Sequence, residues 1–509
     1  MGIRSWLGNK LFNIDKVVDN KVRERLSMHD SAIDLETMKY REKEYKVWAN
    51  ANPNKLLEFY SQNYSREMYD NRFTFWQWVG TADVPKLHYP APEGVMNHMK
   101  SLLFGSEINI EFTTDGNNLK EIKKLNERLH SILEYNNFYE LLQTASMLET
   151  YSGTIGFKIN VDPEFSNKPI IQVYPKERLE LLTKYGKVGE IVFKDYYKRD
   201  RKVYTLRSYY GYGYIDYKLY DDREKEVPLT TIPELANLEK ITFNKKIMMA
   251  VYKKNRTTSN EFIDSPYGGS DFEGVIDLFH AIDETFSTMM LYIRRSRPII
   301  TIPEQLLPHS PDGSRNIIPK EYYFDTILTK PSDIGNDSEG LKRDFPRLDV
   351  SPYITSILEL LKSVYQKIGL SYTTAGLEAH SANISGAALI QKEKNTIIVR
   401  SNKIKLWEHA LQELIRLLLI YDDIINDKTI KTDYSEYELL IEFPDFNETT
   451  FEDKVDLAIK GLQGGVMDYE EAVNYVFDTR YEEERIKEII KNIKIENGVP
   501  LFKEQMSDE

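Results

Sequence analysis

The chain of 509 residues contains no cysteine. Disulfides, thiol nucleophiles and cysteine-ligated zinc are therefore excluded, and the absence suits a protein assembled in a reducing cytoplasm. Long hydrophobic runs are also missing. The most apolar stretch, residues 414–420, is far shorter than a membrane span and contains Arg416. No apolar run near the N-terminus is long enough for a signal peptide, so we expect a soluble protein without a membrane segment.

A surplus of positive charge is absent too. Lys and Arg number 67 against 80 Asp and Glu, which gives a formal net charge of −13. Proteins that hold nucleic acid tightly use surplus Lys and Arg, because phosphate contacts dominate the affinity. The balance argues against tight general DNA binding. It is compatible with DNA that passes without adhering, since like charges repel.

Catalytic signatures are missing as well. The sequence has no G-x-x-x-x-G-K-[ST] phosphate loop, no G-x-S-x-G turn and no third glycine after Gly211 and Gly213 at dinucleotide spacing. Its eight histidines never stand three or four residues apart, so no helical metal pair forms. We predict no enzyme, no catalytic residues, no cofactor and no metal. Carboxylate pairs among the 80 acidic residues keep a DNA-processing enzyme open as the less favoured alternative.

The first half of the chain carries patterns of both helix and strand. Residues 1–60 favour a solvent-facing pair of amphipathic helices. The apolar positions of that pattern are Leu35, Met38, Tyr45 and Trp48. A helix is predicted over 95–104, a strand over 108–112 and helix again over 121–152. Residues 154–260 predict a largely antiparallel sheet, so the fold class is α+β.

Tyrosine-rich alternating runs lie between Tyr196 and Tyr220. Aromatic side chains on strands can stack nucleic-acid bases. Such residues more often pack a half-buried sheet, and this is the interpretation that we favour.

A heptad pattern follows the sheet. Large apolar residues recur at intervals of seven, namely Phe272, Phe279, Phe286 and Ile293. This stripe predicts the packing face of a long helix. Ser270 and Glu273 form a capping-box pattern at its start, and the helix is predicted to end at about Arg295.

Eight of the 20 prolines fall between Pro298 and Pro352. Prolines at this density forbid a long helix, so we predict a compact module of loops and short strands. A second amphipathic helix is predicted over 351–369, with Gly369 at its end. The heptad helix, the proline-rich module and the second helix together predict a long helical hairpin with a small domain at its tip.

The remaining sequence predicts a loop, a long helix, a strand and a helical tail. Residues 370–385 are small, polar and nearly uncharged, which is typical of a loop. A helix is predicted from about 385 to 422, with a bend or break near 401–402. A strand over 438–443 precedes the tail, residues 445–509, which holds 8 basic against 17 acidic residues.

Three segments, in this order, resemble the portal proteins of long-tailed bacteriophages, the SPP1 portal family. Residues 99–108 resemble the family's helix that ends in leucine, an aromatic residue and glycine before a strand. Residues 265–271 precede the heptad helix. Residues 441–445 are followed by acidic helices, as at the family's C-terminal end. The resemblance covers roughly residues 40–500.

The resemblance implies a portal fold with an α/β wing, a two-helix stem, a small α/β clip, a long bent helix and a helical crown. The implied segments are the wing 1–264, first stem helix 265–297, clip 298–350, second stem helix 351–369, tunnel loop 370–385, further wing 386–444 and crown 445–509.

Site residues follow from these segments. The tunnel loop is expected to bring six side chains to a DNA channel, namely Thr373, Thr374, Glu378, His380, Ser381 and Asn383. Arg294, Arg295 and Arg297 are expected to form a basic ring that touches phosphate where stem meets clip, or else to pair with stem carboxylates of a neighbouring copy. The heptad residues Phe272, Phe279, Phe286 and Ile293 are expected to pack the stem helix. The clip is expected to bind its partners through Arg315, Lys320, Lys330, Lys342 and Arg343.

The function implied by the resemblance is a homododecameric ring at one vertex of a phage capsid, through which double-stranded DNA is packaged and ejected. Expected partners are further copies of the chain, the terminase large subunit, a head–tail connector, and the major capsid and scaffolding proteins. DNA would pass non-specifically, and no membrane is involved. The ring would assemble in the host cytoplasm and remain in the virion. Another ring-forming head–tail adaptor is the alternative, although adaptors are usually shorter and lack the long hairpin.

Overall fold

The computed structural model forms two compact units, residues 1–443 and 444–509. It describes residues 32–62, 74–76, 86–113, 119–162, 165–243, 246–257, 259–263, 265–296, 299–303, 326–330, 342–344, 347–373, 375–377, 386–426, 434, 437–444, 451–464 and 467–477. Helices and antiparallel sheets both contribute to the first unit, which confirms the predicted α+β class.

Two N-terminal helices, α3 (Ala32–Ala49) and α4 (Pro53–Gln62), lie in the region where a helix pair was predicted, and of the two α4 is amphipathic. The expectation that they merely face solvent is wrong. Trp48 is fully buried, its indole nitrogen donates to the Tyr60 hydroxyl at 2.8 Å, and its ring lies 5.5 Å from that of Phe279. The pair therefore covers the base of the heptad helix.

The predicted helix and strand after residue 90 are present as α6 (Ala91–Phe104) and β1 (Asn109–Thr113). The helix predicted over 121–152 is instead two helices, α7 (Leu119–Tyr135) and α8 (Phe138–Ser152). The break lies at Asn137, whose φ of 46° is left-handed and cannot continue a right-handed helix.

The strands between residues 154 and 254 pair antiparallel, as predicted. A three-stranded sheet consists of β2 (Thr154–Asn160) between β3 (Ile170–Pro175) and β10 (Val251–Lys254). A six-stranded sheet consists of β4 (Leu179–Lys184), β5 (Lys187–Arg199), β6 (Lys202–Gly211), β7 (Tyr214–Tyr220), β8 (Glu226–Val227) and β9 (Ile241–Thr242). Short 3₁₀ helices are η1 (Lys176–Arg178), η2 (Leu229–Thr231) and η3 (Pro233–Leu235).

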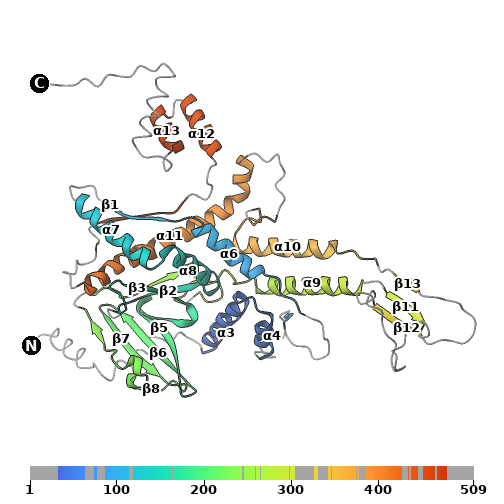
Figure 1. Cartoon of the computed structure of the whole chain (residues 1–509), viewed down its shortest axis with the longest axis horizontal. Coiled ribbons are helices and arrows are strands. Elements are labelled where there is room, and N and C mark those ends of the chain that lie inside the picture. Colours follow the sequence, from blue (N-terminus) through green and yellow to red (C-terminus); the bar gives the residue numbers. More distant parts are fainter. Residues whose placement is uncertain are drawn as a thin grey trace, which may run out of the picture. The chain divides into compact units, whose positions relative to one another are not determined.

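The long helix α11 (Gly386–Ile425) runs through the core of this unit. Its Trp407 is fully buried, with its ring 4.9 Å from that of Phe104 and 6.2 Å from that of Phe157. The helix continues through 401–402, so the break considered there is absent, although Figure 1 shows the helix bending along its length. The predicted final strand, β14 (Glu438–Glu442), pairs with β1.

The predicted hairpin is formed by α9 (Ile276–Arg295) and α10 (Ser351–Ile368). Between them the structure describes a three-stranded sheet. Its strands are β11 (Ile299–Pro303), β12 (Thr326–Lys330) and β13 (Lys342–Asp344), in the order β12-β11-β13. Figure 1 shows this sheet at the far end of the two helices.

The second unit contains α12 (Phe451–Gln463) and α13 (Tyr469–Phe477). The two helices pack through Ala458, Ala472 and Val476. This agrees with the predicted helical character of the tail as far as residue 477. The acidic stretch at 482–485 lies outside the described residues.

Candidate functional site

The two helices of the hairpin lie against each other along their length (Figure 1). Near the outer end, the Tyr292 and Tyr353 rings lie 5.8 Å apart, and the Tyr292 hydroxyl donates to the Arg347 carbonyl at 2.9 Å. At the inner end Gly369, with a φ of 86°, terminates α10 as predicted. The hairpin is thus a defined arm whose inner end is embedded in the body of the chain.

The heptad helix ends at Arg295, as predicted, but it begins at Ile276 and not at Ser270. The predicted capping box is wrong. Gly274 has a φ of 77°, which interrupts a right-handed helix. The Glu273 carboxylate is engaged elsewhere, because it accepts hydrogen bonds from the Ser259 hydroxyl at 3.0 Å and from the Glu261 amide.

The four heptad residues divide into two pairs. Phe272, which precedes the helix, and Phe279 are buried, with ring centroids 5.4 Å apart. Phe286 and Ile293, toward the outer end, are only partly covered within the subunit. The stripe therefore fixes the inner half of the arm, and its outer half keeps apolar surface accessible.

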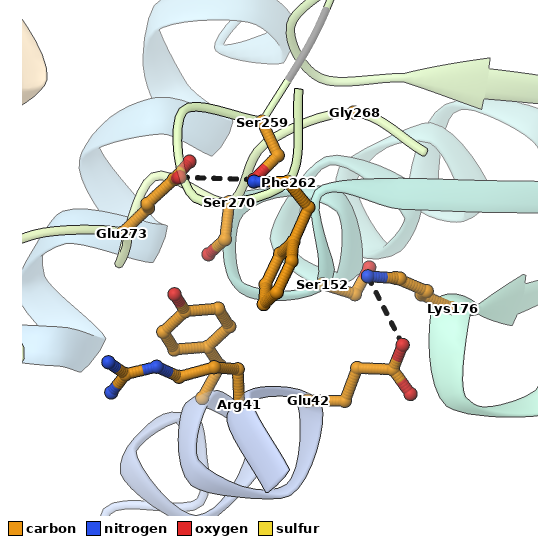
Figure 2. Close-up of a pocket in the computed structure, with 10 residues that line it drawn as sticks. Arg41, Glu42, Ser152, Lys176, Ser259, Phe262, Gly268, Ser270 and Glu273 are labelled. Carbon is orange, nitrogen blue, oxygen red and sulfur yellow. Dashed lines mark hydrogen bonds and ion pairs between the residues drawn. The ribbon is translucent and has the colours of Figure 1, made fainter. Parts of the chain in front are cut away.

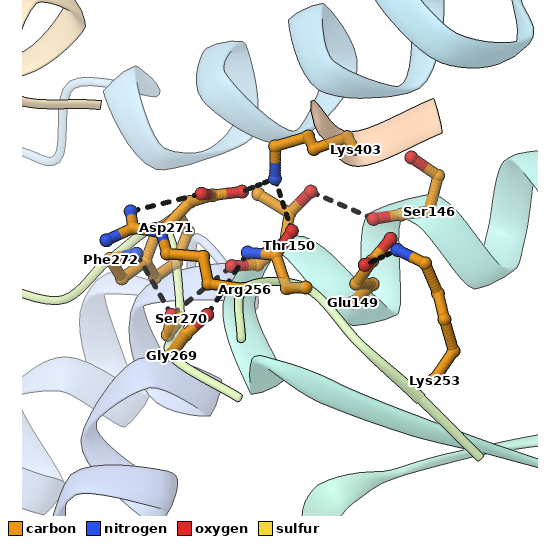
Figure 3. Close-up of polar contacts among 11 residues, drawn as sticks. Ser146, Glu149, Thr150, Lys253, Arg256, Gly269, Ser270, Asp271, Phe272 and Lys403 are labelled. Atoms are coloured by element: carbon orange, nitrogen blue, oxygen red, sulfur yellow. Dashed lines mark hydrogen bonds and ion pairs between the residues drawn. The ribbon is translucent and has the colours of Figure 1, made fainter. Parts of the chain in front are cut away.

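A buried ionic network surrounds the inner end of the arm (Figure 3). The Asp271 carboxylate lies 2.9 Å from the Lys403 ammonium of α11 and 3.2 Å from the Arg256 guanidinium. Lys403 also donates to the Asn255 side chain, and the Ser270 hydroxyl donates to the Thr150 carbonyl at 3.2 Å. These contacts join α8, α11 and the residues just after β10 to the segment that leads into α9.

Charge and burial oppose each other in this network. Burial alone would raise the pKa of Asp271, but the positive charges of Lys403 and Arg256 bring that pKa below its usual value. Burial lowers the pKa of Lys403, and Asp271 opposes this shift. The aspartate is therefore held in its charged form by two cations.

A second buried pair lies beside the first. The Lys253 ammonium contacts the Glu149 carboxylate and lies 4.3 Å from the centre of the Trp407 ring. Burial, together with the positive charge of Lys403, lowers the pKa of Lys253 well below its usual value. Sequence reasoning missed both pairs, because the partners stand 104 and 132 residues apart and no local pattern marks them.

Farther along α9, Asp283 binds the segment before α6. Its carboxylate contacts His88 Nδ1 at 2.8 Å and accepts hydrogen bonds from the Trp76 indole at 2.9 Å and the Tyr89 amide at 2.7 Å. Burial raises the pKa of Asp283, and the contact with His88 opposes that shift. These bonds fix the inner half of α9 to the body at a second place.

A small pocket lies where α3 meets this inner end (Figure 2). Glu42 and Lys176 form an ion pair of 3.1 Å at one side, and Glu273 lies at the other. The cavity of about 20 Å³ has room for about one water molecule. It is too small for a substrate or an organic cofactor. Nor do three His, Asp or Glu side chains gather as metal ligands anywhere in the described ranges.

Of the predicted tunnel loop, the structure describes residues 370–373 and 375–377. Thr373 is buried, with 4% of its surface exposed, so its side chain is withdrawn from the surface expected to meet DNA. The other five predicted loop residues lie outside the described residues, namely Thr374, Glu378, His380, Ser381 and Asn383.

Of the predicted basic ring, Arg294 and Arg295 occupy the last turn of α9 and are exposed, without an ion pair to any residue that the structure describes. Arg297 lies outside the described residues. Cations are favourable at this helix end, because the carbonyl groups there carry partial negative charge. Their position is compatible with both interpretations given above, phosphate contact and pairing with a neighbouring copy.

Three of the predicted clip cations lie on the edge strands of the small sheet. Lys330 is aligned with Pro303, at the end of the sheet remote from α9. Lys342 and Arg343 are aligned with Thr301 and Ile300 on the other side of β11. The remaining two, Arg315 and Lys320, lie outside the described residues.

A mixed α and β body that extends a two-helix arm, with apolar surface left accessible on that arm, favours a structural protein that assembles with other chains. A family model of phage portal proteins, described as SPP1 Gp6-like, matches residues 171–497. This match covers more than half of the chain, and the chain belongs to that family. No curated protein matches the chain.

The matched range includes the whole arm, the segment 265–271 and the segment 441–445. The segment 99–108, which also carried the resemblance, lies before the match. Portal proteins are structural components of the phage capsid. Among the described helices, none combines the length and the apolar character that crossing a membrane requires.

Proposed function

We propose that this portal protein forms a dodecameric ring at one capsid vertex, whose central channel conducts double-stranded DNA during packaging and ejection. The ring would bind the terminase large subunit during packaging and a head–tail connector afterwards. Major capsid and scaffolding proteins would surround it, and it would assemble in the host cytoplasm. Family membership and the two-helix arm support this proposal.

The observation that carries the proposal is apolar surface on the outer part of the arm. On and just before α10, Leu348, Ile354 and Leu358 are 49%, 47% and 37% exposed. A solitary subunit would leave these side chains in water, whereas a ring covers them because each copy presents one face to the next. The partly covered Phe286 and Ile293 of α9 add to the same accessible surface.

The segments then take the following roles in the proposal. The arm would be the stem around the channel, and the small sheet between its helices would be the clip that meets terminase and connector. Residues 370–385 would be the tunnel loop, and the second unit would be the crown. The rest of the first unit would be the wing.

Electron microscopy and native mass spectrometry of the purified chain test the ring. Closed rings of twelve copies with a central hole are expected. Ile354→Glu with Leu358→Glu is expected to prevent ring closure while leaving a folded subunit, because both side chains are already exposed in the subunit. As the matched control, Tyr185→Glu with Ile241→Glu places two acids at exposed apolar positions of the wing sheet and is expected to leave rings intact. A chain that stays monomeric at high concentration would contradict the proposal.

Phage that lacks this chain distinguishes a portal from an adaptor. A portal must be present before DNA enters the head, so heads without DNA are expected. Heads that fill with DNA but fail to join a tail would instead indicate an adaptor that is added after packaging.

A further inference from the structure

The hairpin of β5 and β6 extends beyond the strands on either side of it. The pairing of β4 with β5 stops at Phe193, and the pairing of β7 with β6 stops at Thr205. Three further pairs continue the hairpin outward, namely Tyr197 with Tyr204, Lys198 with Val203 and Arg199 with Lys202. Among the described strands none lies beside these pairs, so the end of the hairpin is a two-stranded ribbon. Its first pair, Tyr197 with Tyr204, packs against the cluster that contains Ile232 and Leu235, and the last two pairs form the exposed tip.

The tip of this ribbon is strongly basic in a chain of net charge −13. Four of the five residues 198–202 are Lys or Arg, the fifth is Asp200, and all five are exposed. Arg199 donates to the Thr231 carbonyl and lies 3.8 Å from the highly exposed Asp200 carboxylate. Lys198, Arg201 and Lys202 form no ion pair with any residue that the structure describes.

Two features of the tip lower the stability of the hairpin, namely its backbone conformation and the repulsion between like charges. Asp200 and Arg201 have φ angles of 49° and 62°, a two-residue hairpin turn of the kind that prefers Asn-Gly. Arg201, at the second position of the turn, has a left-handed backbone, which is strained for arginine but not for glycine. In addition, Arg199 and Lys202 stand directly opposite each other, and like charges in such a pair repel. Contacts within the fold therefore do not account for Lys198, Arg201 and Lys202.

We propose that residues 198–202 bind the phosphate backbone of double-stranded DNA. Lys and Arg at an exposed tip neutralise phosphates, and contacts to the phosphate backbone need no access to the base edges. A protein partner fits less well, because five residues cannot bury the roughly 800 Å² per partner that a stable protein interface needs. Phosphate contacts need no such area, since released counterions supply the affinity.

The net negative charge of the chain argues against a general DNA-binding surface, so the proposed contact is a local one. The site is separate from the proposed channel, because it lies on the wing sheet. The inference relies on the proposed function only for the presence of DNA near the protein.

Fluorescence anisotropy of the full chain with short random-sequence duplexes, measured over a range of salt, tests the site. Lys198→Gln with Lys202→Gln is expected to lower the slope of log Kd against log salt by about 2, because each phosphate contact contributes about 0.9. At low salt, duplex binding should weaken by about tenfold or more. The control, Lys184→Gln with Lys187→Gln, removes two exposed lysines from the opposite end of the same sheet and should retain the wild-type slope. Equal losses in both variants, or no binding by the wild-type chain, would overturn the proposal.

A second variant separates binding from folding. Arg201→Gly leaves Asp-Gly, a pair that this turn prefers, so Tm is expected to rise while the salt slope falls by about 1. A raised Tm with unchanged duplex binding would show that the tip has only a structural role. If poly-glutamate binds the tip more tightly than duplex DNA, an acidic protein is the partner and the proposal is wrong.

Electron microscopy of the same variants tests ring formation separately from DNA binding by the tip. Rings are expected from all of them. A chain that binds duplex DNA through the tip but never forms rings would contradict the proposed function and leave the present inference standing.

Discussion

The Lys403 ammonium lies 2.9 Å from the Asp271 carboxylate, and both side chains are buried. The pair joins α11 to the residues that lead into α9. Two charges taken out of water are tolerated only when each has partners, and here Arg256 and Asn255 complete the set. The inner end of the arm is therefore fixed by charge as well as by apolar packing.

Lys403→Met is expected to destabilise the subunit by about 3–5 kcal/mol, because Asp271 would remain buried beside Arg256 alone. Asp271→Leu in the same chain is expected to restore most of the lost free energy, since the one charge that then remains, on Arg256, is partly exposed to water. Urea unfolding measures both. Lys405→Met, at an exposed position of the same helix, is the control and should change stability by no more than about 0.5 kcal/mol. Equal effects at positions 403 and 405 would contradict the buried-pair account.

Two aspartates near the inner end of the arm are expected to respond to pH in opposite directions. Burial raises the pKa of Asp283 above its ordinary value of 3.8, so its contribution to stability is complete below that value and declines as pH rises toward the raised pKa. Burial would also raise the pKa of Asp271, but Lys403 and Arg256 lower it. Its contribution is therefore complete above 3.8 and is lost as pH falls toward the lowered pKa. The loss of unfolding free energy caused by Asp283→Asn should therefore shrink as pH rises above 3.8. The loss caused by Asp271→Asn should instead grow as pH rises toward 3.8. Unfolding curves between about pH 3 and pH 7 measure both trends, and trends of the same sign would contradict the assignment.

Phe279 and Phe286 should separate folding from assembly. Phe279 is fully enclosed, so Phe279→Ala is expected to cost about 3–5 kcal/mol of subunit stability. Phe286 is only partly covered, so Phe286→Ala should cost the subunit less and reduce the yield of rings more. Chemical unfolding and native mass spectrometry supply the two measurements. If both variants lose the same free energy of unfolding, the outer half of the stripe stabilises the subunit itself and not its contacts with neighbouring copies.

Replacing Arg294, Arg295 and Arg297 together by Ala tests the proposed basic ring. If these residues touch phosphate, DNA packaging or retention should fall while rings remain intact. Packaging assays and electron microscopy of the same particles measure the two effects. Unchanged packaging would exclude a contact with phosphate, and rings that dissociate more readily would support pairing with carboxylates of a neighbouring copy.

Local signals predicted the elements whose ends are determined locally. Pro352 in the first turn and Gly369 at the end predicted α10, and the structure confirms both limits. The predicted start of α9 was wrong because of contacts with residues outside the helix. Ser270 and Glu273 have the spacing of a capping box, yet Glu273 accepts hydrogen bonds from Ser259 and Glu261 instead.

Burial was the property that the sequence predicted least well. Trp48 and its helix pair resemble a solvated amphipathic surface in the sequence, yet the rings of His88 and of Phe279 in α9 lie against Trp48 in the fold. Lys253 and Lys403 are equally unmarked, because a buried lysine differs from an exposed one only in distant partners. The roles predicted for the tunnel loop, the basic ring and the clip cations all stay predictions.

The pairing of β1 with β14 has a consequence for synthesis. Asn109 and Glu442 are aligned across this ladder although 333 residues separate them. At about 5–20 residues per second, a ribosome delivers the second strand roughly 20–70 s after the first. Until then β1 presents an open edge to which another nascent chain can bind. The first unit is therefore completed only when nearly all of its residues have left the ribosome, which delays the appearance of subunits that can join one another.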